Sequence, residues 1–117
     1  SVAGLGWWVT RPGAQPSEDA GRRVAEAFLN QLRDGHPDAA WDATTAEFKS
    51  AQGKESFSRS VRPLKFLRNP LEFVSSQLVT VGNIQHKEFS FRATSGETVR
   101  IVIGREGNDW KVDLWAH

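Results

Sequence analysis

The sequence predicts an α+β fold, with N-terminal helices packed on a curved four-stranded antiparallel sheet. In the first half of the chain, apolar residues recur every three or four positions, which is the period of an α-helix. After Pro70 the pattern changes to alternation, which is typical of strands with one buried face. Short turns separate the strand-like runs, so neighbouring strands should pair as hairpins. Helices followed by strands are characteristic of an α+β fold.

The length, charge balance and composition of the chain limit what kind of protein it can be. A chain of 117 residues is long enough for one core, and we expect one domain over residues 18–117, preceded by an apolar arm and linker over residues 1–17. Lys and Arg number 15 against 14 Asp and Glu, and this balance argues against a nucleic-acid partner. The absence of cysteine excludes disulfides, and the three histidines lack metal-binding spacing. We therefore expect no metal and no cofactor.

Three helices are expected. The first covers residues 18–35, with Ser17 as its N-cap and one apolar stripe along its length. The second covers residues 37–51 and follows a His-Pro turn. The third is short, lies after Gly53 and is ended by Pro63, because the residue before a proline disfavours helical geometry.

Four strand-like runs follow, at residues 75–81, 86–93, 98–105 and 109–115. In the second run, Phe89 and Phe91 alternate with polar residues, so these phenylalanines should face the core. In the last run, strict alternation puts Asp113 on the solvent side, together with Lys111 and Trp115. The runs are expected to form an antiparallel meander.

The stretch GLGWWVTRPG, residues 4–13, is unusually apolar for the surface of a soluble domain. Trp7 and Trp8 follow small apolar residues and precede Arg11 and a proline, an order typical of the interfacial end of a membrane-spanning helix. The chain has no methionine, so we expect a segment upstream of Ser1, and a membrane anchor ending in this stretch is one interpretation. The alternative is an apolar arm that packs on this domain or on a second copy.

Two segments carry a recognisable pattern. AEAFLNQLRDGHPDAAWDATTAEFK combines an apolar helix, a Gly turn and a second helix, and VRIVIGREGNDWKVDLW has a Gly turn before a Trp-x-Val strand. Both resemble the nuclear transport factor 2 / ketosteroid isomerase-like superfamily, in particular its small bacterial domains of unknown function. The resemblance implies a cone-shaped, cystatin-like fold over residues 18–117. Because the superfamily includes isomerases, dehydratases, transport factors and non-catalytic modules, the resemblance leaves the activity open.

An isomerase of this kind would need a carboxylate base inside the cone, with hydrogen-bond donors opposite. Asp42 and Asp113 are weak candidates for a catalytic role, and a solvated surface carboxylate is the simpler interpretation of each. The chain has no tyrosine, so one common oxyanion donor of this chemistry is missing. We therefore assign no catalytic residue.

The aromatic and basic residues suggest two kinds of contact. Five Trp and seven Phe either fill the core or line a pocket. If the cone is open, a small apolar ligand is expected to contact Phe28, Trp41, Phe89, Phe91 and Trp110. A membrane or a partner is expected to contact Trp7 and Trp8 and four cations spaced three residues apart: Arg59, Arg62, Lys65 and Arg68. The alternative for these cations is an ordinary solvated face.

Three functions remain open. The favoured hypothesis is a non-catalytic module that binds a partner or a small apolar ligand, in a membrane-anchored or exported bacterial protein of the cell envelope. The second is a small isomerase or dehydratase that uses a buried carboxylate. The third is a structural module that forms a homodimer. A cytoplasmic location is the alternative to the cell envelope.

Overall fold

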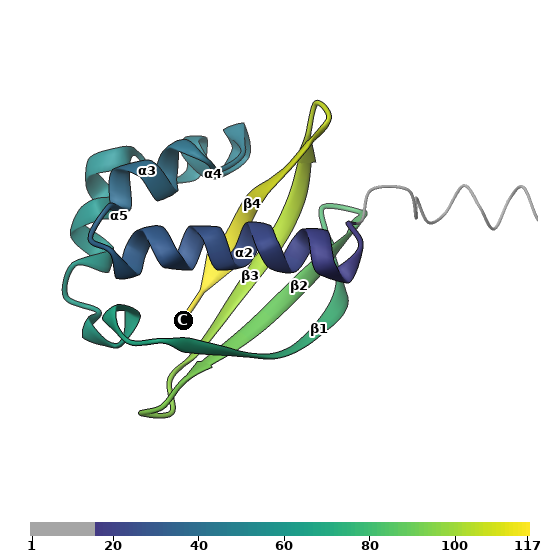
Figure 1. Ribbon diagram of the computed structural model, residues 1–117. Coiled ribbons are helices and arrows are strands. Elements are labelled where there is room, and N and C mark those ends of the chain that lie inside the picture. The colour runs from purple at the N-terminus through teal and green to yellow at the C-terminus, as the bar shows by residue number, and fades with distance from the viewer. Residues whose placement is uncertain (1–15) are drawn as a thin grey trace, which may run out of the picture.

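The computed structural model describes residues 16–117, and in it helices pack on one face of a four-stranded antiparallel sheet (Figure 1). The strand order is β1-β2-β3-β4, so each strand pairs with its neighbour in sequence. The sheet is open and not strongly curled. The α+β arrangement of helices followed by an antiparallel sheet is confirmed. Most of the predicted arm, residues 1–15, lies outside the described residues.

The elements follow the predicted order. The helices are α2 (Glu18–Arg33), α3 (Pro37–Asp42), α4 (Ala46–Ala51), α5 (Lys54–Val61) and the 3₁₀ helix η2 (Lys65–Arg68). The strands are β1 (Leu71–Val81), β2 (Ile84–Ala93), β3 (Thr98–Glu106) and β4 (Asp109–Ala116). As predicted, Ser17 caps α2, since its side chain accepts a hydrogen bond from the backbone N–H of Ala20 at 3.1 Å. No helix in the described range is long and apolar enough to cross a membrane.

The expected single helix over residues 37–51 is wrong, because the chain breaks between α3 and α4. Thr44 forms a parallel bridge with Val112 of β4, and the N–H of Thr45 donates to the carbonyl of Val112 at 3.0 Å. These two residues therefore extend along the edge of β4. Thr45 then caps α4, accepting a hydrogen bond from the N–H of Phe48 at 3.2 Å. A tertiary contact has overridden the local helical tendency.

A β-bulge in β4 changes which residues face the core. Val102 pairs with Leu114 and Ile103 pairs with Val112, so Asp113 is an extra residue in β4. Alternation is therefore reversed beyond it, and Trp115 packs against the core while Leu114 is 43% exposed. The predictions that Trp115 lies on the solvent side and that Asp113 is solvated are both wrong, since Asp113 is only 9% exposed.

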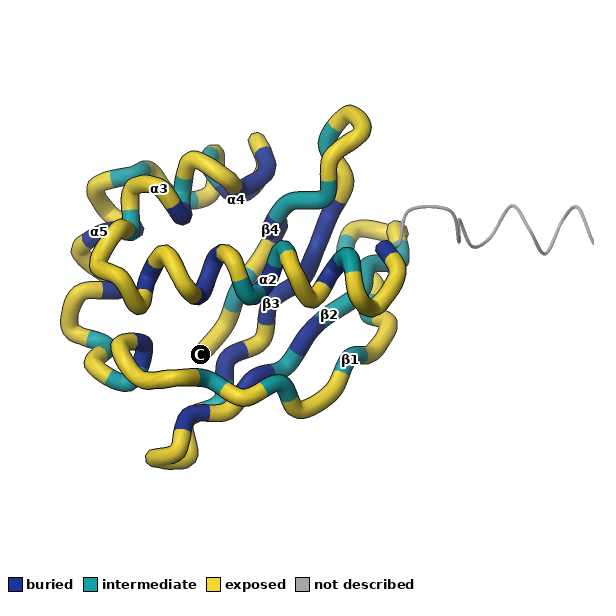
Figure 2. Tube along the Cα trace, in the orientation of Figure 1, coloured by how far each residue is buried: buried dark blue, intermediate teal, exposed yellow. Residues whose placement is uncertain are grey.

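The space between the helices and the sheet is filled by aromatic rings. Phe57 contacts Phe28, Phe48 and Trp115 with ring centroids 5.6–5.9 Å apart. Phe89 fits below α2 because position 21 is glycine, where an added Cβ would lie 2.4 Å from its ring. Figure 2 shows the result, with buried segments on the inner side of α2 and along β2 and β3. The helices and the sheet thus share one aromatic core.

Candidate functional site

The aromatic residues expected to contact a ligand fall into two groups. Phe89 and Phe91 are fully buried and pack with Phe73 across the β1–β2 pair, at ring separations of 6.3 and 5.7 Å. Phe28 is also buried, at 3% exposed, but together with the half-buried Trp110 it borders a groove that is open to solvent. The structure therefore places three of the five in the filled interior, and one of these three, Phe28, borders the groove together with Trp110.

The groove lies between α2, α3 and the β3–β4 hairpin and has a volume of about 560 Å³. Phe28 and Val24 contribute from α2, and Trp110 contributes from β4. The other apolar lining residues are small: Ala20, Ala27, Ala39, Ala40, Ala43 and Val112. On α2 the lining spans three turns, roughly 16 Å. Alanine side chains leave this space open, whereas phenylalanine rings fill the neighbouring interior.

Polar and charged residues complete the lining of the groove. They are Arg23 and Gln31 on α2, and Asn108, Asp109 and Lys111 on the β3–β4 hairpin. Lys111 is paired with Glu106 at 3.0 Å. Within residues 16–117, Arg23 and Asp109 form no ion pair. An apolar groove with a few unpaired charges is the usual form of a site for a small molecule that carries a polar group.

Trp41, the fifth predicted ligand residue, lies outside the groove. Its indole N–H donates to the carbonyl of Gln52 at 2.8 Å. The ammonium groups of Lys49 and Lys54 lie 5.4 and 5.3 Å from its ring centroid, within the range of a cation–π interaction. Trp41 therefore joins α3 to the segment around α4 and α5.

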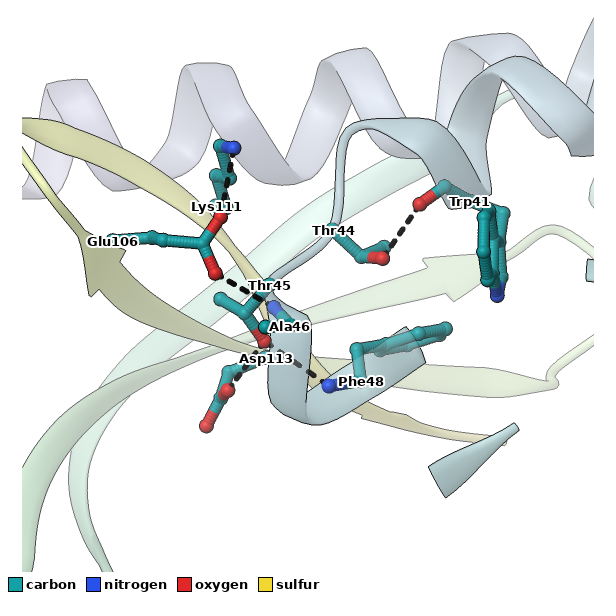
Figure 3. A network of polar contacts seen from close by, with 8 residues as sticks. All are labelled: Trp41, Thr44, Thr45, Ala46, Phe48, Glu106, Lys111 and Asp113. Atoms are coloured by element: carbon teal, nitrogen blue, oxygen red, sulfur yellow. Dashed lines mark hydrogen bonds and ion pairs between the residues drawn. The ribbon is translucent and has the colours of Figure 1, made fainter. Parts of the chain in front are cut away.

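The two candidate catalytic acids have structural partners. Asp42 is exposed and pairs with Lys54 at 2.9 Å. Oδ1 of Asp113 accepts a hydrogen bond from the hydroxyl of Thr45 at 2.7 Å (Figure 3). Gly104 leaves room for this carboxylate, because a Cβ at position 104 would lie 3.1 Å from the Cβ of Asp113. Neither acid lines the groove.

A second carboxylate strengthens the same connection between α4 and the sheet. Glu106 accepts a hydrogen bond from the N–H of Ala46 at 2.7 Å and an ion-paired hydrogen bond from Lys111 at 3.0 Å (Figure 3). The backbone N–H of Ala46 and then Lys111 hold the pKa of Glu106 below its ordinary value. We call the contacts of Thr45 with Asp113 and of Ala46 with Glu106 the α4 latch.

The four predicted contact cations are exposed, and they belong to elements at the C-terminal end of α2. Arg59 and Arg62 belong to α5 and its C-cap, and Lys65 and Arg68 belong to η2. Figure 1 shows that the described chain begins at the other end of α2. The cations are therefore far from the start of the described chain, and Trp7 and Trp8 lie outside the described residues. In the described range, no group of three or more His, Cys, Asp and Glu residues could hold a metal ion.

Sequence reasoning did not find the alanines of the groove or the role of Thr45. The run of alanines on α2 and α3 was visible, but alanine is also the best helix former, so its presence did not indicate a groove. Thr44-Thr45 was a possible capping signal inside the expected helix. Its meaning depended on the neighbouring β4, which is far away in sequence.

Comparison with protein-family models and with curated proteins adds no relative. No model of a known protein family matches the chain, and no curated protein matches it either. The residues of the groove and of the α4 latch are therefore the basis for inferring a function.

Proposed function

We propose that this protein is a non-catalytic binding module that takes a small apolar ligand in the groove between α2, α3 and the β3–β4 hairpin. One observation carries the proposal: an open, mostly apolar groove of about 560 Å³ beside an interior that is otherwise filled by aromatic rings. Ligand sites for small molecules commonly have volumes of about 300–1,000 Å³. The groove lies within that range.

The lining suggests what such a ligand would look like. Its apolar body would lie along the alanines of α2 and α3 and against the ring of Trp110. Burying apolar surface there is favourable by about 25 cal/mol per Å². A polar end would meet Arg23 or Asp109, which have no ion-pair partner in the described part of the chain.

The positions of the acids favour binding over catalysis. A general base must reach the substrate, directly or through one water. Asp42 pairs with Lys54 on the exposed side of α3, and Asp113 supports the cap of α4. An isomerase using either residue would require the substrate to approach a carboxylate that does not line the groove.

We also propose that the fold is a cone-shaped, cystatin-like relative of the nuclear transport factor 2 / ketosteroid isomerase-like superfamily, in a membrane-anchored or exported protein. The order of helices and hairpins supports the fold. The Trp7-Trp8 stretch supports the anchor. Fractionation of cells that express the full-length protein tests the anchor, and recovery only in the soluble fraction would contradict it.

The groove is tested by filling it. Ala39 is exposed and lines the groove, so Ala39→Phe should occupy the ligand's space without disturbing the core. Ala51→Phe is the matched control, since Ala51 is an exposed helical alanine that does not line the groove. Small apolar compounds are screened by thermal shift and tryptophan emission, because a ligand of the folded state raises the melting temperature.

The proposal expects compounds that stabilise the wild type and Ala51→Phe but not Ala39→Phe. If Ala39→Phe responds like its control, the ligand binds elsewhere and the groove is not the site. If no compound shifts the wild type, an interaction role is favoured over a small-molecule site. Sedimentation over a range of protein concentrations then tests the homodimer.

A further inference from the structure

The four exposed cations of α5 and η2 form one connected basic surface. Arg59 and Arg62 are three residues apart on α5 and its C-cap, so their side chains are neighbours on one helical face. Lys65 and Arg68 are three residues apart on η2, and a 3₁₀ helix with three residues per turn places such side chains one above the other. Arg62 and Arg68 line the same hollow, of about 160 Å³, which joins the two pairs. We call these four residues the basic surface.

No acid of the described chain pairs with the basic surface. Its four residues are exposed, and none forms an ion pair with another residue of the described range. The rest of the lining of the hollow shared by Arg62 and Arg68 is uncharged. Asp38 borders a neighbouring hollow together with Arg62. With this carboxylate counted, the basic surface still has an excess of three positive charges.

The basic surface also gives the chain an uneven distribution of charge. Residues 56–71 contain its four cations and no acid. With these four removed from the 15 Lys and Arg of the chain, 11 remain against 14 Asp and Glu, so the remainder of the chain is net negative. A protein with this asymmetry is attracted to an anionic surface with its basic part foremost.

Apolar side chains lie among the cations. Leu64 and Phe66 are half-buried, since each packs against the core and keeps part of its surface accessible, and Pro63 is exposed. Cations combined with accessible apolar groups are typical of segments that bind at the membrane interface, where the apolar groups reach below the headgroups. This combination favours a lipid bilayer over an acidic protein, which would need only the cations.

We propose that the basic surface binds the anionic surface of a lipid bilayer, with its cations among the headgroups and the accessible parts of Leu64 and Phe66 against the interface. The contact does not depend on the proposed groove, because no residue of the basic surface lines it. It does not depend on the proposed anchor either, because Trp7 and Trp8 are not among its residues. Each of these proposals is therefore tested separately.

The first test is sedimentation of the full chain with vesicles of phosphatidylcholine alone and of phosphatidylcholine mixed equally with phosphatidylserine. We expect stronger partitioning into the anionic vesicles, and this preference should decrease with added salt. The double variant Arg62→Gln, Arg68→Gln should weaken partitioning into the anionic vesicles about tenfold or more, because each cation near an anionic surface contributes about fivefold.

The matched control is the double variant Arg92→Gln, Arg100→Gln. It removes the same charge from two exposed residues of β2 and β3, outside the basic surface. Its partitioning into the anionic vesicles should stay within a few-fold of the wild type. Equal weakening by the two double variants, or equal partitioning of the wild type into both kinds of vesicle, would overturn the proposal. Thermal melting of both variants verifies that they are folded.

The second test separates the basic surface from the proposed anchor. The double variant Trp7→Ser, Trp8→Ser removes the interfacial tryptophans and leaves the basic surface unchanged. Its preference for anionic over neutral vesicles should remain as large as that of the wild type. Loss of this preference would assign the membrane contact to the tryptophans and overturn the role of the basic surface.

The third test distinguishes a bilayer from an acidic protein. Poly-glutamate and anionic vesicles are each added to the full chain, and the amide signals of Arg62 and Arg68 are followed by NMR. Loss of these signals with anionic vesicles, at charge concentrations where poly-glutamate has little effect, supports the bilayer. Saturable shifts with poly-glutamate and no response to the vesicles would identify an acidic protein as the partner and overturn the proposal.

Discussion

The two edge strands of the sheet, β1 and β4, are protected in different ways. Along β4, Thr44 and Thr45 pair with Val112, and the α4 latch adds contacts to Asp113 and to Glu106 in the adjacent β3. Along β1, no residue is buried. The contacts from α2 to β1 include a hydrogen bond of 2.8 Å from Ser76 to Glu18 and the guanidinium of Arg22 over the ring of Phe73.

The difference shows where the fold is held together. An exposed edge strand invites pairing with other chains, and bulges reduce that risk. In β1 the register shifts between Phe73 and Ser75, so Val74 is an extra residue that interrupts the edge. In β4 the bulge at Asp113 has a second use, because it places a carboxylate within reach of the cap of α4. We therefore expect stability to depend on the β4 side far more than on β1.

The largest expected effect comes from the aromatic core beside β4. Phe57 is fully buried and contacts three other rings. Phe57→Ala should lower the free energy of unfolding by about 3–5 kcal/mol, because it removes a ring and leaves a cavity. Chemical denaturation measures this change. If Phe57→Ala does not fold, Phe57→Leu should show a smaller loss of the free energy of unfolding.

The matched substitution on β1 is Leu78→Ala. Leu78 is 53% exposed, so its truncation should change the free energy of unfolding by no more than about 0.5 kcal/mol. A loss at Leu78 comparable with that at Phe57 would show that β1 is covered in solution, and the contrast between the two edges would fail.

The next effect concerns the hydroxyl of Thr45. Thr45→Ala should cost about 1–3 kcal/mol, because it removes the cap of α4 and leaves the buried carboxylate of Asp113 without its donor. Ser17→Ala removes the cap of α2, which has no such second partner, and should cost only about 1 kcal/mol.

A double-mutant cycle between Thr45→Ala and Asp113→Ala isolates the latch itself. Residues in direct contact couple by about 0.5–3 kcal/mol, and we expect a coupling within that range. Additive effects would mean that the hydrogen bond between them contributes nothing to the attachment of α4.

The parts of the fold that depend on local pattern were predictable, and the parts that depend on distant contacts were not. Alternation correctly put Phe89 and Phe91 in the core, since β2 is regular over those residues. The same rule failed at Trp115, because a bulge adds one residue that the pattern does not mark. Phe28 and Trp110 were predicted as ligand contacts and line the groove, but the alanines that keep it open looked like ordinary helix residues.

The smallest expected effect is a difference between the β4 and β1 edges in how stability depends on pH. The N–H of Ala46 and then Lys111 lower the pKa of Glu106 from its ordinary value of about 4.5. A carboxyl whose pKa is lower in the folded state stabilises the fold above its unfolded value. That stabilisation is lost as the pH falls from about 4.5 through the lowered pKa of Glu106.

Glu106→Gln should therefore flatten the acid limb of a plot of stability against pH, and denaturation at a series of pH values measures it. Glu72→Gln is the control on β1, because the side chain of Glu72 is exposed and forms no hydrogen bond or ion pair with the described residues. Since both substitutions remove one carboxylate, any difference between their curves reports the attachment of α4 to the sheet. If the two curves coincide, the charge of Glu106 does not hold α4. The attachment of α4 to β4 then depends on Thr45 and the backbone pairing alone.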